Sequence, residues 1–233
     1  YKSSLLNYLS SNNSISSLIT DNERRAMALL ALGENPYSFQ DVNYIEAIIK
    51  EFDGEQFGDT DLINDDIFAL IPLSSSDYSD EDEIIQKDIA FIISKQNTNG
   101  SFEGSVDITA AAIQALKLFD DLDGADEAIS KAEDYLKSTQ GDDGGWGNIS
   151  STSWAMQAEA ALGGSWENNG KDGMDYLASQ QDSADNNGGL LPPAESNENV
   201  IWATSYAIPA GLGKPWSEIM DPVSKPKTES SSG

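Results

Sequence analysis

The stretch Gln140–Leu162, QGDDGGWGNISSTSWAMQAEAAL, decides the fold of this chain. It starts with the glutamine that ends a predicted helix and passes through a glycine-rich turn that carries Trp146. It then continues as an alanine-rich segment behind a run of serines and a threonine, residues that favour helix starts. The sequence therefore predicts a helix, an aromatic turn and a second helix.

The same unit recurs at a fixed spacing along the chain. Phe102 lies 44 residues before Trp146, and Phe57 lies 45 residues before Phe102. Leu190, which follows another glycine pair, lies 44 residues after Trp146. A fixed period of this length is typical of stacked supersecondary units, none of which buries its apolar face alone.

The two helices of each unit differ in side-chain size. The second is rich in alanine, whereas the first carries bulkier residues such as Ile85, Ile89 and Ile92. Small side chains let helix axes approach closely, so we expect the alanine-rich helices to form an inner layer and the others an outer layer. The pattern predicts an all-α fold, an α/α toroid (an incomplete α/α barrel) of about five helical hairpins. The expected inner helices lie near residues 21–33, 64–73, 107–119, 151–163 and 198–211.

The repeat pattern also sets the expected domain boundary. Residues 1–216 are expected to form the toroid domain, because the length suits a single domain with a sizeable core. Residues 217–233 are rich in proline and serine and are predicted to be a linker to a further C-terminal segment.

Composition excludes several classes of function. The chain has no cysteine and no histidine, which excludes disulfides, thiolate nucleophiles, imidazole bases and the commonest zinc-ligand sets. Its formal net charge of -27 repels phosphate backbones and anionic membrane surfaces. We therefore expect no nucleic-acid partner, no membrane contact and no cofactor.

The unit, read as a glutamine, a glycine-rich turn, an aromatic residue and a Thr-Ala or Trp-Ala helix, resembles the prenyltransferase and squalene oxidase repeat. This QW motif is found in terpenoid-cyclase-like α/α toroids. The resemblance covers roughly residues 1–216 and is carried by Gln140 with Trp146 and by Gln96 with Phe102. It implies that these glutamines, and Gln180 in the next unit, cap a neighbouring helix end while the aromatic ring stacks beneath.

The resemblance also allows the enzymes of the family to be tested against this sequence. The acid box of class II cyclases, Asp-x-Asp-Asp-Thr-Ala, aligns with Ser105–Ala110, where Asp107 alone of the three aspartates is kept. Prenyltransferase β subunits, thioester domains and lanthionine cyclases need cysteine, with or without histidine, and this chain has neither. A glycosidase needs only two carboxylates, so composition does not exclude one.

The function expected from these features is that of a non-enzymatic, extracellular or cell-surface binding or adhesion domain. It resembles the toroid domains of surface proteins and, at the level of fold, the helical domain of cobalamin carriers. The alternatives are a cobalamin-like small-ligand domain, a carboxylate-dependent glycosidase and a degenerate terpene cyclase. The expected partner is a protein, a glycan or a small molecule.

A binding site is expected at the N-terminal ends of the inner helices, where side chains converge on the central depression. An alternative for the polar candidates is helix capping, and for the tryptophans inner-layer packing. The acidic segment 41–88 is interpreted as a solvated surface, with weak calcium binding by Asp53, Asp59, Asp61, Asp65 and Asp66 as the alternative. The candidate ligand-binding residues are Asp66, Asp107, Thr109, Thr152, Trp154 and Trp202.

Overall fold

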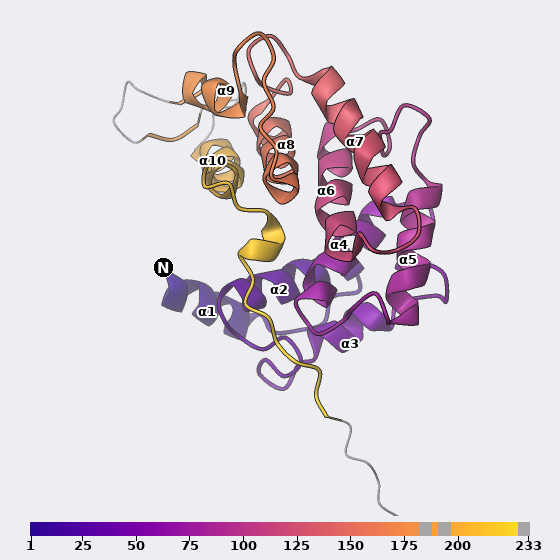
Figure 1. Cartoon of the computed structure of the whole chain (residues 1–233). Helices are drawn as coiled ribbons and strands as arrows, with labels where there is room; N and C mark the ends of the chain where they lie inside the picture. Colours follow the sequence, from indigo (N-terminus) through magenta and orange to yellow (C-terminus); the bar gives the residue numbers. More distant parts are fainter. Residues whose placement is uncertain (182–187, 191–196, 228–233) are drawn as a thin grey trace, which may run out of the picture. The chain divides into compact units, whose positions relative to one another are not determined.

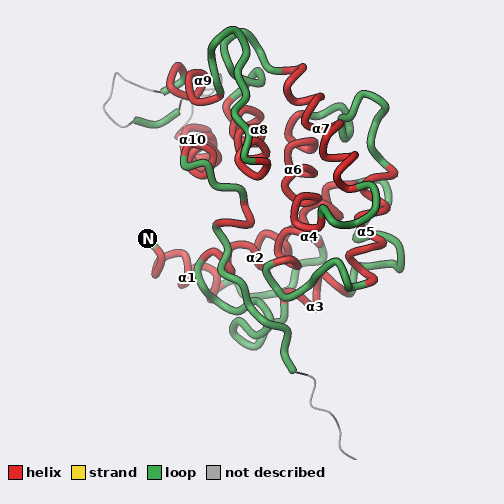
Figure 2. The backbone as a smooth tube through the Cα atoms, in the orientation of Figure 1, coloured by secondary structure: helices red, strands yellow, loops and turns green. Residues whose placement is uncertain are grey.

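The computed structural model describes residues 1–181, 188–190 and 197–227 and contains only helices and loops over these residues (Figure 1, Figure 2). Two short 3-10 helices, Lys117–Phe119 and Trp216–Glu218, accompany the α-helices. The all-α class is confirmed. The α-helices are α1 (Lys2–Ser11), α2 (Ile19–Ala31), α3 (Tyr44–Ile49), α4 (Ile63–Ser74), α5 (Glu83–Ser94), α6 (Val106–Leu116), α7 (Ala125–Thr139), α8 (Ile149–Leu162), α9 (Gly173–Ser179) and α10 (Asn197–Gly211).

The five predicted inner helices correspond to α2, α4, α6, α8 and α10, with ends that agree to within a few residues. The helical spacing of Ile45, Ile48, Ile49 and Phe52 indicates an outer helix that reaches residue 52, but only Tyr44–Ile49 is helical. The helix does not continue to Phe52, because Phe52 forms an isolated antiparallel bridge with Phe57 across the turn. The aromatic turn therefore begins earlier in this repeat than helical periodicity indicates.

The chain divides into two compact units. The first contains Tyr1–Phe91 together with Ile219–Gly233, and the second contains Ile92–Glu218. Residues 219–227, part of the predicted linker, are attached to the first unit by backbone hydrogen bonds from Asp221 to Leu30 and from Val223 to Ser75. The division at residue 216 into a domain and a linker stays a prediction.

In the second unit, three alanine-rich helices lie next to one another. Helix α8 contacts both α6 and α10, while α7 contacts α6 and α9 contacts α8 (Figure 1). Ala110, Ala112, Ala155 and Ala158 are fully buried between these helices. Small side chains thus produce the close layer of α6, α8 and α10 that the sequence predicts, although the helix α7 that packs against α6 also buries three alanines.

In the first unit, α2 contacts α3 and α4, and α3 also contacts α4. The apolar faces of these helices meet at Leu30, Ile48, Ile67 and Leu70, whose side chains are fully buried together with the turn residue Phe57. Burial of such side chains is the main driving force for folding of this unit.

Candidate functional site

The aromatic turns are held by side chains from the following inner helix. The backbone N–H of Phe102 donates a hydrogen bond to Thr109 Oγ1 at 2.9 Å. The backbone N–H of Trp146 donates in the same way to Thr152 Oγ1, also at 2.9 Å. Both threonines are fully buried. Each threonine therefore fixes the turn that carries the ring of its own repeat.

The repeats on either side use the same contact with different residues. In the first unit, Asp66 replaces threonine, and its Oδ1 accepts a hydrogen bond from the backbone N–H of Phe57 at 2.7 Å. In the last repeat, Thr204 Oγ1 accepts from the N–H of Leu190 at 3.0 Å. Thr204 was not among the predicted site residues, because it lies 14 residues after Leu190, whereas the other three residues lie six to nine residues after the ring position. The available signal was its Thr-Ser-Tyr-Ala string, which is similar to Thr-Ser-Trp-Ala at Thr152.

The polar candidates Asp66, Thr109 and Thr152 therefore bind the backbone of the preceding turn, and their side chains do not face an open depression. They are not the caps of their own helices either, since Ser105 caps α6 and Asn148 caps α8. The capping alternative is therefore wrong for these residues. They still have a structural role, because each holds the backbone of the preceding turn.

Thr152→Val is expected to lower the free energy of unfolding by about 1–3 kcal/mol, because the buried N–H of Trp146 loses its acceptor while side-chain volume is kept. Urea unfolding followed by circular dichroism measures the change. Thr152→Ser keeps the hydroxyl and should recover most of the loss, whereas Thr139→Val, at an exposed position, should cost little. Equal effects of the valine and serine variants would contradict this role.

Two of the three repeat glutamines join separate segments of the chain, although neither caps a neighbouring helix end as the resemblance implies. Gln96 Nε2 donates to the carbonyl oxygens of Gly100 and Ala128, at 3.0 and 2.8 Å. Gln140 Nε2 donates to the carbonyl oxygens of Gly144 and Trp166, at 2.9 and 3.4 Å. Each side chain thus joins its own turn to a later segment.

The assignment of Gln180 is wrong. Its Nε2 contacts Ser179 Oγ, while Gln181 Nε2 donates to the carbonyl oxygen of Gly188 at 2.9 Å and takes the role instead. Gln181 also forms an isolated bridge with Leu190. Helix α9 ends at Ser179, so Gln181 is the second residue after its helix, as Gln96 is after α5.

Asp107 lies in the first turn of α6 and is half-buried. The N-cap of this helix is Ser105, whose hydroxyl oxygen accepts a hydrogen bond from the N–H of Ile108. An acidic side chain in the first turn interacts favourably with the helix dipole, which gives Asp107 a structural reason to be present. It is not brought together with the other candidates of the second unit by any described hydrogen bond.

The two tryptophan candidates are brought together through a third ring. The ring centroids of Trp154 and Tyr206 lie 5.8 Å apart, and those of Tyr206 and Trp202 lie 5.5 Å apart. On the other side, Trp154 contacts Trp216 at 5.9 Å. Sequence reasoning identified Trp154 and Trp202 but not Tyr206, which connects them, or Trp216. The four rings, Trp216, Trp154, Tyr206 and Trp202, are called the aromatic row below.

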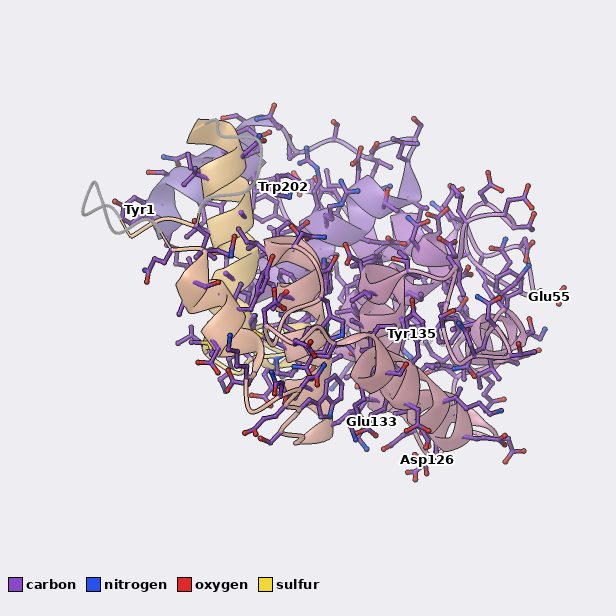
Figure 3. The ribbon with its side chains drawn as sticks, turned by 90° about the horizontal axis from the view of Figure 1, so that it is seen from above. Tyr1, Glu55, Asp126, Glu133, Tyr135 and Trp202 are labelled. Atoms are coloured by element: carbon purple, nitrogen blue, oxygen red, sulfur yellow. The ribbon has the colours of Figure 1, made fainter. Side chains whose placement is uncertain are left out.

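The aromatic row leads from the interior to the surface of the second unit. The Trp154 side chain is 8% exposed, whereas that of Trp202 is 63% exposed on α10 (Figure 3). Next to Trp202, the side chains of Ile201, Ile208 and Leu212 are 70%, 58% and 70% exposed. Positions 201 and 208 share one side of α10, and Leu212 follows the last residue of the helix, Gly211. This apolar side of α10, Ile201, Trp202, Ile208 and Leu212, is the exposed surface that the candidates define.

The inner end of the aromatic row is anchored by two inner-helix glutamines. The backbone N–H of Trp216 donates to Gln114 Oε1 at 3.0 Å, and Gln157 Nε2 donates to the carbonyl oxygen of Lys214, also at 3.0 Å. These contacts hold the loop after α10 against α6 and α8. The position of Trp216, and through it that of Trp154, is therefore fixed by residues that lie far away in the sequence.

The acids considered for calcium binding mostly accept hydrogen bonds from turn backbone. Asp65 Oδ2 accepts from the N–H of Asp59, Asp59 Oδ1 from the N–H of Asp61, and Asp53 Oδ1 from two N–H groups of its own turn. Asp59 and Asp65 line an open groove of about 580 Å³. Within the described part of the chain, no group of three or more acidic residues has the geometry of a metal site. Calcium binding stays a prediction.

Comparison with known proteins agrees with the repeat. Residues 49–151 match the family model of the squalene-hopene cyclase C-terminal domain, so this segment carries the prenyltransferase and squalene oxidase repeat that the sequence resembles. No curated protein and no solved structure matches the chain. None of the described helices has the length and hydrophobicity needed to cross a membrane.

Proposed function

We propose, from the squalene-hopene cyclase repeat carried by residues 49–151, that this chain is a non-enzymatic binding domain that acts outside the cell or at its surface. Its contact surface is the apolar side of α10. The observation that carries the proposal is the aromatic row, which ends at the exposed Trp202, together with the exposed aliphatic side chains Ile201 and Ile208 on α10 and Leu212 just after it.

A surface of this composition suits a partner that is itself apolar. Exposed aromatic and aliphatic side chains in contact with one another are typical of interaction sites, since they lose hydration when a partner covers them. The rings behind Trp202 limit its movement, so less conformational entropy is lost on binding. The proposed partner is a protein with a complementary apolar face, and glycans and cobalamins are the competing ligands to be tested.

The polar residues of the repeat support a binding function rather than catalysis. Asp66, Thr109 and Thr152 are fully buried and occupied with the backbone of the turns. A desolvated carboxyl pair does exist, but it consists of Asp66 and Asp88, and neither side chain is exposed to a substrate. A general acid must reach the atom that it protonates, so these carboxyl groups do not meet the requirement of a glycosidase or a cyclase in this arrangement.

Trp202→Ala is expected to weaken partner binding by at least about fivefold, because an exposed aromatic anchor typically contributes more than about 1 kcal/mol to an interface. Its melting temperature should stay close to that of the wild type, since the side chain is 63% exposed. Extracellular proteins of the source organism, a glycan array and cobalamins are tested separately, with Kd measured by tryptophan fluorescence or calorimetry. Ile208→Ser should have a similar, smaller effect.

Leu18→Ala is the matched control, because Leu18 is 63% exposed, as Trp202 is, and lies in the first unit before α2. It should leave binding unchanged. If Trp202→Ala and Ile208→Ser bind as the wild type does, the proposed surface is wrong. Hydrolysis or cyclisation of a glycan or isoprenoid substrate that is abolished by Asp66→Asn would favour an enzyme instead. Fractionation of the source cells tests the proposed location.

A further inference from the structure

Three carboxyl groups from three different helices are buried together in the first unit. Glu23 lies on α2, Asp66 on α4 and Asp88 on α5, and the side chains of all three have no exposed surface. The carboxyl groups of Asp66 and Asp88 are within hydrogen-bonding reach of one another. The charge of Glu23 acts on Asp88, and the charge of Asp66 acts on Glu23. These residues are called the carboxyl cluster.

The carboxyl cluster lacks hydrogen-bond donors. Both oxygens of Glu23, both of Asp88 and Oδ2 of Asp66 have no hydrogen-bond partner among the described residues. No ion pair in the described part of the chain involves any of the three. An ionised carboxylate that is buried without a donor or a counter-charge is strongly unfavourable, so a bound proton is the simplest way to stabilise such a site.

The groups around the carboxyl cluster do not supply the missing charge. Asp65 on α4 adds a further negative charge beside Glu23, and Asp59 lies next to Asp65. Arg24 on α2 is the one cation that acts on the cluster, and its effect on Glu23 is smaller than that of burial and of the neighbouring acids. Helix α3 contributes the buried hydroxyl of Tyr44, which has no hydrogen-bond partner. A neutral, protonated cluster is consistent with all of these neighbours.

We propose that Glu23, Asp66 and Asp88 form a proton-binding cluster, so that the first unit folds with protons bound at these carboxyl groups and loosens as the pH rises. A proton shared between Asp66 and Asp88 forms one hydrogen bond between the two carboxyl groups and removes one of their two negative charges. Asp66 also holds the aromatic turn through the N–H of Phe57. Ionisation of the cluster is thus coupled directly to the turn that organises this repeat.

The direction of the pH dependence follows from the pKa values. Burial raises the pKa of Asp66 to about 6, from 3.8. Burial and the neighbouring carboxyl groups raise the pKa values of Glu23 and Asp88 well above their ordinary values. Because the folded state holds protons that the unfolded chain has released, the stabilisation is complete below about pH 4 and is lost as the pH rises through about 6 and above. This is the reverse of ordinary acid denaturation.

The test uses hydrogen exchange of the whole chain between pH 5 and pH 8, corrected for the intrinsic exchange rate. The opening constant of the α2 and α4 amides should increase by at least about tenfold from Asp66 alone, and further if Glu23 and Asp88 also ionise. Amides of α6 and α8 in the second unit serve as an internal reference. If α2 and α4 open no more readily at pH 8 than at pH 5, the proposal is wrong.

Variants separate the carboxyl cluster from the general effect of the net charge. Asp66→Thr places in the first unit the residue that holds the turn at Thr109 and Thr152, so the turn should be kept while the pH dependence decreases and protection at pH 8 increases. Asp88→Asn, which is nearly isosteric, should do the same if Asp66→Thr does not fold. Glu55→Gln, at an exposed acid of the same unit, should leave the pH dependence unchanged (Figure 3). An undiminished pH dependence in both cluster variants would overturn the proposal.

Salt and calcium complete the experiment. Repulsion between surface carboxylates is screened at 0.5 M NaCl, whereas the effect of a buried cluster persists. A pH dependence that disappears in salt would therefore overturn the proposal. If millimolar calcium restores protection at pH 8 to its value at pH 5, the cluster binds a metal ion rather than protons, which also overturns it.

Discussion

Gly144→Ala is expected to lower the free energy of unfolding by about 3–5 kcal/mol, a large fraction of the stability of an ordinary domain. Gly144 has a φ of +85°, and a Cβ atom added to it would lie 2.1 Å from the carbonyl oxygen of Asp172. That oxygen belongs to the N-cap of α9, so the turn or the helix start must move. The left-handed φ and the backbone overlap both contribute to the loss.

Gly147 is the matched control for this substitution, because it lies in the same turn with a φ of +81° and has no atom within 4 Å of an added Cβ. Gly147→Ala should therefore cost only the left-handed conformation, about 1–2 kcal/mol. Urea unfolding followed by tryptophan fluorescence reports on the second unit, which contains both glycines, since all five tryptophans lie between residues 146 and 216. Equal losses for the two variants would show that close contact with Asp172 is unimportant.

Trp146→Ala should lower the free energy of unfolding by about 3–5 kcal/mol, the range found when a large core aromatic residue is truncated. The Trp146 side chain is 5% exposed, and its ring lies 6.3 Å from that of Trp166. Its Nε1–H donates to the carbonyl oxygen of Leu136 at 2.8 Å, near the C-terminal end of α7. The residue thus combines apolar burial with a contact to one of the free carbonyl groups of a helix end.

Trp146→Phe separates the two contributions, because phenylalanine is the residue at the same place in two other repeats. The ring is kept and the hydrogen bond to Leu136 is lost, so the expected cost is about 1–2 kcal/mol. Circular dichroism during urea unfolding is the suitable measurement, since the substitution removes a fluorophore. A cost for Trp146→Phe as large as that for Trp146→Ala would mean that the hydrogen bond, rather than burial, dominates.

The repeat was predictable because its signals are local. Glycines with positive φ, an aromatic residue at a fixed distance and an alanine-rich helix behind it lie within about 20 residues, and the period of the mid-forties shows that these units stack. Gln96 and Gln140 were recognisable as structural residues for the same reason, since the carbonyl of their own turn lies four residues ahead, but they do not cap a neighbouring helix end. In the last repeat the contact is made by Gln181, one residue after the position that the motif predicts. The exact position of residues at a helix end depends on tertiary contacts, which the motif does not contain.

The roles of the candidate residues were not predictable from position along a helix. Thr109 and Thr152 lie near the N-terminal ends of inner helices, as expected. Their hydroxyl groups, however, are already hydrogen-bonded to the backbone of the preceding turn. Trp154 and Trp202 were chosen as separate residues, and Tyr206, which joins them, has no distinguishing mark in the sequence. Trp202 is exposed because a different side of α10 packs against α8. In an alanine-rich helix several sides are small enough to pack closely, so the sequence does not show which side is buried.

The sequence by itself determined the all-α class, the repeat, the positions of the inner helices and the exclusion of cysteine and histidine chemistry. These properties depend on the spacing of residues and on which residue types are present, and both can be read directly from the sequence. Only the tertiary structure decided that Glu23 and Asp88 join Asp66 in one buried cluster and that the aromatic row ends at an exposed Trp202. Burial and electrostatic environment come from side chains that converge from distant parts of the chain, and no local pattern encodes that convergence.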